Sequence, residues 1–157
     1  MTNAYTGGCQ CGAVRFRAGA FGRAAICHCR MCQKAFGSFF GPYVTALDFE
    51  WTRGAPKYFH SSNAGRRGFC ADCGTQLTFE AGGGVELAIG ALDDPGWAPP
   101  VIEVNPRDKV SFFAALCRLP PRPAAEQPQT DARLARVVSR QHPDRDTDAW
   151  PPEAGRS

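Results

Sequence analysis

Residues 27–32 read Cys-His-Cys-Arg-Met-Cys, and this stretch determines how the other cysteines of the chain can be assigned. Its three cysteines lie too close together to reach three separate partners. Clustered thiolates suit a shared soft metal ion, most often zinc. Because a closed structural zinc takes four ligands, Cys27, Cys29 and Cys32 predict one of two arrangements. Either a fourth ligand comes from elsewhere, or one coordination position is open to a substrate.

The remaining cysteines also fall into tight groups. Of the 8 cysteines in the 157-residue chain, four form the pairs Cys9/Cys11 and Cys70/Cys73, and only Cys117 stands alone. A disulfide framework is typical of smaller secreted domains, in which the cysteines are spread over loops. The grouping therefore favours metal ligation over disulfide bonds.

The two outer pairs supply the four thiolates of a closed structural zinc site. Residues 7–12 read Gly-Gly-Cys-Gln-Cys-Gly and residues 69–74 read Phe-Cys-Ala-Asp-Cys-Gly. Glycine beside the thiols allows the tight turn of a zinc knuckle, because it accepts positive φ angles. The ion would join positions about 60 residues apart and stabilise the whole domain. We expect nearby cations to offset its negative charge, and the candidates are Arg15, Arg17, Arg66 and Arg67.

The candidates for a fourth ligand of the central cluster are His28, His60 and Cys117. His28 lies between two ligands, where strain makes it an awkward co-ligand. His60 stands alone in a strand-like run, and Cys117 follows an apolar run in which a lone cysteine is usually a small buried hydrophobe. None is compelling, so we expect the open position that is typical of catalytic zinc.

A zinc ion held by three thiolates suits an incoming thiol, because binding lowers the pKa of that thiol and holds it as the thiolate. The predicted chemistry is therefore the formation or cleavage of a bond to sulfur. Arg30 and Lys34 flank the motif and could attract an anionic thiol such as glutathione. The alternative is that both are solvated surface charges.

Short strands separated by frequent turns predict a mainly β fold. The expected strands lie at residues 14–17, 24–27, 38–44, 47–51, 57–60, 75–79, 85–92, 101–104 and 110–116, and a brief helical turn is expected at 30–36. We expect residues 1–119 to form the zinc-binding β domain. Residues 120–157 are expected to be a Pro-rich linker and a polar tail, poorly ordered or loosely docked. The tail has one candidate amphipathic helix at 131–141.

Charge and hydropathy exclude several other classes. The formal net charge is only +3, and the basic residues are spread along the chain without a basic block, so we expect no nucleic-acid binding. The first residues lack the pattern of a signal peptide, and no apolar run approaches the ~20 residues that a membrane span needs. We therefore expect no membrane association and a cytoplasmic location.

Four motifs together resemble a known family. They are residues 7–14 (Gly-Gly-Cys-Gln-Cys-Gly-Ala-Val), 27–33 (Cys-His-Cys-Arg-Met-Cys-Gln), 37–38 (Gly-Ser) and 69–75 (Phe-Cys-Ala-Asp-Cys-Gly-Thr). In order and spacing they resemble the glutathione-dependent formaldehyde-activating enzyme family, which includes the centromere protein V-type proteins. The resemblance runs from about residue 5 to 92. It implies small stacked antiparallel sheets around zinc sites, as in the zinc-binding fold of Rab exchange factors and methionine sulfoxide reductase B.

The same resemblance implies a function and a division of the cysteines. Cys9, Cys11, Cys70 and Cys73 match the structural zinc ligands, and Cys27, Cys29 and Cys32 match the catalytic zinc ligands, which gives two zinc ions per chain. The implied activity is that of a carbon–sulfur lyase that joins formaldehyde to glutathione as S-hydroxymethylglutathione, or reverses this step. The alternative is a non-catalytic module in which both zinc sites only hold loops in place for protein recognition.

Overall fold

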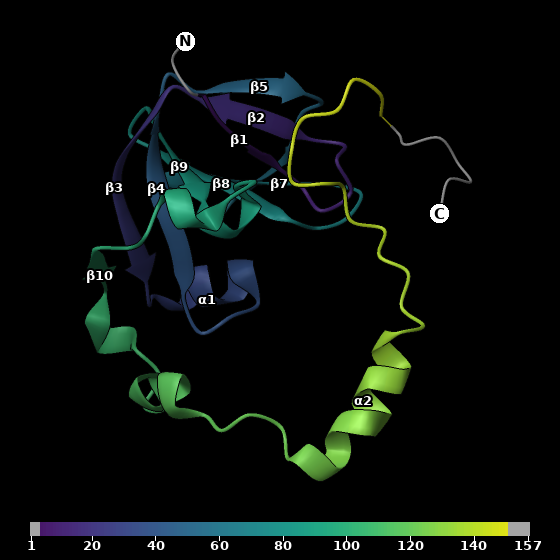
Figure 1. The fold of residues 1–157 in the computed structure, drawn as a ribbon. Helices are drawn as coiled ribbons and strands as arrows, with labels where there is room; N and C mark the ends of the chain where they lie inside the picture. The colour runs from purple at the N-terminus through teal and green to yellow at the C-terminus, as the bar shows by residue number, and fades with distance from the viewer. Residues whose placement is uncertain (1–3, 151–157) are drawn as a thin grey trace.

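Ten strands and two α-helices form most of the regular structure in residues 4–150, the part of the chain that the computed structural model describes (Figure 1). The strands are β1 (Tyr5–Gly8), β2 (Arg15–Ala18), β3 (Ala20–Cys27), β4 (Gly41–Leu47), β5 (Glu50–Arg53), β6 (Lys57–His60), β7 (Gly65–Phe69), β8 (Gln76–Ala81), β9 (Gly84–Ala88) and β10 (Ile102–Val104). The helices are α1 (Arg30–Phe36) and α2 (Gln127–Leu134).

The strands build two sheets. A three-stranded sheet has the order β1-β2-β5, and a seven-stranded sheet has the order β10-β3-β4-β9-β8-β7-β6. The predicted mainly β class is confirmed, and the pairings are antiparallel except for the one between β10 and β3, which is parallel. The sequence pattern gave no sign of this parallel edge, because it joins two segments far apart in the chain.

Both sheets contribute to one core. Phe16 of β2 is fully buried and meets Trp51 of β5 edge to face at 6.1 Å. Leu77 of β8 and Leu87 of β9 belong to the same apolar cluster. Val44 of the neighbouring strand β4 is paired with Leu87 and belongs to this cluster too. The small sheet is therefore held against the large one mainly by burial of apolar side chains.

Helix α1 follows β3 directly and carries part of the central cysteine motif. Cys29 is its N-cap, and Gly37 ends it with a φ of 57°, donating its N–H to the carbonyls of Gln33 and Lys34. A glycine in this left-handed conformation is a common way to end a helix. The helical turn predicted at 30–36 is confirmed.

Two expectations for the region after β10 differ from the structure. The strand expected at 110–116 is wrong, because residues Phe113–Arg118 form a 3₁₀ helix. Phe112 and Phe113 pack edge to face on Phe39 and Phe40, at 4.9 and 5.6 Å, and do not pair with a sheet. The tail helix α2 lies earlier than the expected 131–141, since Pro128 in its first turn favours a helix start there.

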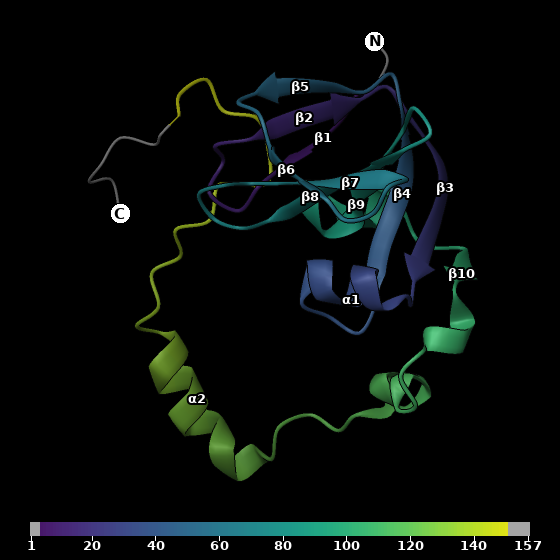
Figure 2. The same ribbon diagram turned by 180° about the vertical axis from the view of Figure 1, so that it is seen from behind.

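Beyond residue 119 the chain makes a wide arc away from the sheets, passes through α2 and returns to the loop between β1 and β2 (Figures 1 and 2). The returning segment, residues 142–150, contacts that loop through His142 and Trp150. Residues 151–157 of the expected tail lie outside the described part of the chain, and the boundary at 119/120 stays a prediction. No helix in residues 4–150 is long and apolar enough to cross a membrane.

Candidate metal centres

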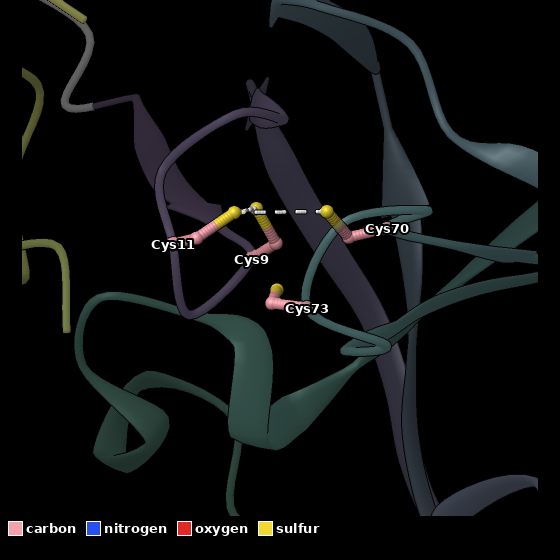
Figure 3. A group of neighbouring side chains, drawn as sticks. All are labelled: Cys9, Cys11, Cys70 and Cys73. Atoms are coloured by element: carbon pink, nitrogen blue, oxygen red, sulfur yellow. Dashed lines mark hydrogen bonds between the residues drawn. The ribbon is translucent and has the colours of Figure 1, made fainter. Parts of the chain in front are cut away.

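The two outer cysteine pairs come together as the sequence predicts (Figure 3). Cys9 and Cys11 lie on the loop between β1 and β2, and Cys70 and Cys73 lie on the loop between β7 and β8. The four Sγ atoms all lie within 4.8 Å of one another. This four-cysteine cluster can hold a metal ion, and it links the two sheets.

Each loop of this cluster is a tight turn with a glycine at positive φ. Gly12 (φ 83°) donates its N–H to the carbonyl of Cys9, and Gly74 (φ 76°) donates to the carbonyl of Cys70. The N–H of Val14 also points at the Sγ of Cys9, at 3.2 Å. Backbone donors of this kind favour the ionised thiolate that binds a metal.

The pKa values of two thiols in the four-cysteine cluster, Cys11 and Cys73, are shifted in opposite directions. Burial, together with hydrogen bonds to the neighbouring thiols, raises the pKa of Cys11 to about 12. For Cys73 burial also acts upward, but hydrogen bonds from the side chain and backbone of Thr75 outweigh it and lower the pKa to about 6. Four thiolates this close repel one another, so all four ionise together only around a cation. The donor set therefore fits a divalent metal ion.

The central cysteines form a second cluster, the three-cysteine cluster. Cys27 ends β3, Cys29 caps α1 and Cys32 lies within that helix. Their Sγ atoms also lie within 4.8 Å of one another. The Sγ of Cys29 accepts a hydrogen bond from the backbone N–H of Cys32, at 3.4 Å. The strand end and the first helical turn thus bring three nearby residues to one point.

Three side chains that the cysteine spacing does not reveal support this second cluster. Arg67 of β7 donates to the Sγ of Cys32 at 3.5 Å and to the hydroxyl of Tyr43 at 2.6 Å. Asn105 donates to the Sγ of Cys27 at 3.4 Å. For Cys27 the effect of burial, which raises its pKa, is outweighed by hydrogen bonds that include the one from Asn105, and the pKa is lowered. Burial and the nearby Cys27 raise the pKa of Cys32 to about 12, against the hydrogen bond from Arg67.

None of the three sequence candidates for a fourth ligand joins these thiols within residues 4–150. The His28 ring is fully buried and packs edge to face on Phe113 at 4.7 Å, with its Nε2 3.6 Å from a carboxylate oxygen of Glu103. His60 is exposed on β6. Cys117 is exposed on the 3₁₀ helix, which corrects the expectation of a buried cysteine.

The four arginines expected to offset the outer cluster have other partners. Arg15, Arg17 and Arg66 pair with carboxylates, and these ion pairs are Arg15 with Asp93 and Asp146, Arg17 with Glu50, and Arg66 with Glu80. For Arg67 the expectation is wrong, since its guanidinium contacts the other cluster. The sequence signal that could have separated Arg67 from Arg66 is the alternation of side chains along β7, because it turns one of two adjacent arginines toward the inside of the protein. Of the charges beside the motif, Arg30 donates to Gln33, and Lys34 lines a small cavity with Met31 and Phe59.

A cavity of about 510 Å³ opens beside Cys27 and Cys32. Its wall includes Tyr43 and Phe79, and its charged residues are Arg23 and Glu86. Arg23 lies four residues before Cys27 on the same face of β3, roughly 13 Å along the strand. Glu86 pairs across the sheet with Thr45, which also donates to it at 2.9 Å. The cavity therefore runs from the thiols to a charged end.

Fold and clusters together define a small, mainly β protein with two cysteine clusters that could hold metal ions, compatible with zinc. A model of the glutathione-dependent formaldehyde-activating enzyme family matches residues 4–108, well over half of the 157-residue chain. The chain belongs to this family. The matched range includes all seven clustered cysteines, together with Arg67 and Asn105.

The fold is also similar to that of a solved structure. A Rhodobacter sphaeroides protein of known crystal structure aligns with a TM-score of 0.52 and 20% sequence identity. The alignment covers 63% of this chain and 99% of that protein. At this identity the likeness supports the fold alone.

Proposed function

We propose that this protein is a zinc-dependent carbon–sulfur lyase that forms or cleaves the S-hydroxymethyl adduct of a thiol, with glutathione as the thiol and formaldehyde as the aldehyde. The observation that carries this proposal is the three-cysteine cluster. Cys27, Cys29 and Cys32 converge beside a cavity, and no fourth protein ligand joins them in residues 4–150. Family membership supports the choice of thiol and aldehyde.

The two clusters have different roles in this proposal. Cys9, Cys11, Cys70 and Cys73 would hold a structural zinc that joins the sheets. Cys27, Cys29 and Cys32 would hold the catalytic zinc, which supplies an open, soft coordination position for a thiolate sulfur. Tyr43 and Phe79 line the cavity beside these thiols, and Arg23 and Glu86 offer charges for the polar end of the thiol.

The reaction needs a proton at the aldehyde oxygen. The thiolate sulfur bonds to the carbonyl carbon, the π electrons move to the oxygen, and the oxygen takes up a proton; cleavage reverses each step. Tyr43 lines the cavity, and its hydroxyl accepts a hydrogen bond from Arg67, which leaves its own proton for donation. Burial raises the pKa of Tyr43, so this hydroxyl stays protonated at neutral pH. We assign Tyr43 as the hydrogen-bond donor to the aldehyde oxygen.

The test is the rate of adduct formation from formaldehyde and glutathione, which exchange NMR at equilibrium can follow in both directions. The protein should accelerate exchange above the uncatalysed background, and Cys32→Ser should return it to background. Cys117→Ser is the matched control, because Cys117 is exposed and belongs to neither cluster. A wild-type rate equal to background with glutathione would refute the proposed activity.

A non-catalytic protein-binding module is the second candidate, and exposed apolar side chains favour it. Met31, within the cysteine motif, is 50% exposed and Phe59 is 63% exposed, and both line a cavity of about 320 Å³. Exposed apolar surface of this kind is typical of interaction sites. The same exchange measurement separates the two functions, because a binding module gives no rate above background at any zinc content.

A further inference from the structure

Arg67 is a buried cation without a carboxylate partner in the described chain. Its side chain is only 5% exposed, and no Asp or Glu oxygen of residues 4–150 lies within 4.0 Å of it. The guanidinium contacts the Tyr43 hydroxyl, the Cys32 sulfur and the face of Phe79, whose centroid is 4.9 Å away. An uncompensated buried charge is strongly destabilising, so we expect an anion nearby.

Arg15 shows how this fold neutralises a buried arginine elsewhere. It is 3% exposed, and its guanidinium binds the carboxylates of Asp93 and Asp146. Arg67 has no equivalent in residues 4–150, where the only groups in contact with it that can become anionic are Cys32 and Tyr43. Because burial raises the pKa of Tyr43, its hydroxyl stays neutral. The cysteine cluster is therefore left as the source of negative charge.

Charge balance agrees with this assignment. Three thiolates around a divalent ion leave one net negative charge, which a single arginine cancels. The four-cysteine cluster would keep two negative charges, and Arg15, Arg17 and Arg66 are already paired with carboxylates, while Arg53 donates to the carbonyl of Gly12 and to Thr147. A neutral centre accepts an incoming anionic thiolate more readily than a negatively charged centre does.

We propose that Arg67 is the counter-ion of the three-cysteine metal centre, a positioning residue that keeps the metal bound and lets the centre accept an anionic sulfur ligand. This inference rests on the proposed function for the presence of the metal. It adds a residue, a charge and a reason why one centre is suited to thiolate binding and the other to structure.

The experiment measures zinc per chain by elemental analysis after dialysis against graded concentrations of EDTA. Arg67→Gln removes the charge but keeps a hydrogen-bond donor, and Arg67→Lys keeps the charge. The matched control is Arg66→Gln on the adjacent position, whose side chain points the other way and pairs with Glu80. Cys32→Ser provides a reference chain without the three-cysteine centre. Both Arg67 variants are polar and smaller than arginine, and folding is checked by circular dichroism.

In Arg67→Gln the second zinc should be lost at an EDTA concentration about tenfold or more below that for the wild type, the usual effect of removing a group that supports a metal ligand. The zinc of the four-cysteine cluster should be retained as in the wild type. Arg67→Lys should lose the zinc of the three-cysteine cluster at an EDTA concentration close to that for the wild type, and Arg66→Gln should lose it at the same concentration as the wild type. Equal retention in Arg67→Gln and the wild type overturns the proposal, as does equal loss in the Lys and Gln variants. A wild type with one zinc refutes the catalytic centre itself, which is a separate failure.

Discussion

At the scale of single residues, Arg15 is a buried cation with two carboxylate partners, Asp93 and Asp146. Arg15 donates to both carboxylate oxygens of Asp93, at 2.8 and 2.6 Å, and the hydroxyl of Thr6 donates to the same group at 2.6 Å. Burial acts to raise the pKa of Asp93, but these hydrogen bonds outweigh it and lower the pKa below its usual value. The pair joins β2 to the segment after β9 and stabilises the small sheet.

Asp93→Asn should lower the free energy of unfolding by about 3 kcal/mol at neutral pH, because it leaves Arg15 buried with only the half-exposed Asp146. Urea denaturation measures the loss. Asp94→Asn is the matched control, since Asp94 caps a short 3₁₀ helix by accepting from Gly96, and asparagine caps equally well. Equal losses in both variants would show that the ion pair contributes nothing specific.

The same pair predicts a pH dependence. The pKa of Asp93 is lower in the folded protein than in the unfolded chain, so its contribution is complete above the unfolded value of about 3.9. The contribution is lost as the pH falls through the lower folded value, where the carboxylate takes up a proton. The stability gap between wild type and Asp93→Asn should therefore close in acid. A gap that is constant from pH 7 to pH 3 would contradict this.

Single residues also show where the sequence sufficed and where it did not. Spacing was enough to place Cys27, Cys29 and Cys32 together, because residues so close in the chain meet whatever the rest of the fold does. The partners of Arg67 and Arg15 could not be read from spacing. They depend on which face of a strand each side chain takes and on which distant segment covers that face.

At the scale of elements, the loop between β1 and β2 is held by a segment from the other end of the chain. The backbone N–H of His142 donates to the carbonyl of Gln10 at 2.7 Å, and the indole of Trp150 donates to the carbonyl of Cys11 at 2.8 Å. His142 is buried against Gly12. Residues 142–150 thus form a strap over one half of the four-cysteine cluster.

Two glycines allow a test of the strap. Gly12 and Gly74 both adopt positive φ in the turns of the cluster, but a Cβ at Gly12 would lie 2.2 Å from the His142 ring, while one at Gly74 would meet nothing within 4 Å. Both alanine substitutions add backbone strain of roughly 1 kcal/mol. Only Gly12→Ala should also displace the strap, which faster amide hydrogen exchange in residues 142–150 would report. Equal exchange in the two variants would mean that the strap is not held by this contact.

Element boundaries were predictable where the pattern was local. The alternating strand β2, the strand β6 and the helical turn of α1 follow from residues that lie within them. The strand expected at 101–104 is confirmed as β10, but its parallel pairing with β3 was not predictable. The strap was not predictable either, because it is polar, contains proline and makes hydrogen bonds to distant groups, which are the carbonyls of Gln10 and Cys11 and the side chains of Arg15 and Arg53. Such contacts leave no periodicity in the sequence.

At the scale of the whole molecule, the two clusters join the chain very differently. The four-cysteine cluster connects the β1–β2 loop of the small sheet to the β7–β8 loop of the large one, and these loops are about 60 residues apart in the chain. The three-cysteine cluster gathers residues 27–32, which β3 and α1 already hold together. A cross-link between distant segments restricts the unfolded chain much more than one between near neighbours. The two ions should therefore contribute unequally to stability.

Cys73→Ser and Cys32→Ser test this difference directly, since each removes one thiol from one cluster. In the zinc-loaded protein, Cys73→Ser should lower the thermal midpoint strongly, because a structural zinc can contribute on the order of 10 kcal/mol to folding. Cys32→Ser should lower it less, although it also takes from Arg67 its contact with the Cys32 sulfur, and it should leave the far-ultraviolet circular dichroism unchanged while adduct formation is lost. Excess EDTA should bring the wild type toward the Cys73→Ser midpoint. If Cys32→Ser proved the more damaging of the two, the assignment of a structural role to the four-cysteine cluster and a catalytic role to the three-cysteine cluster would be wrong.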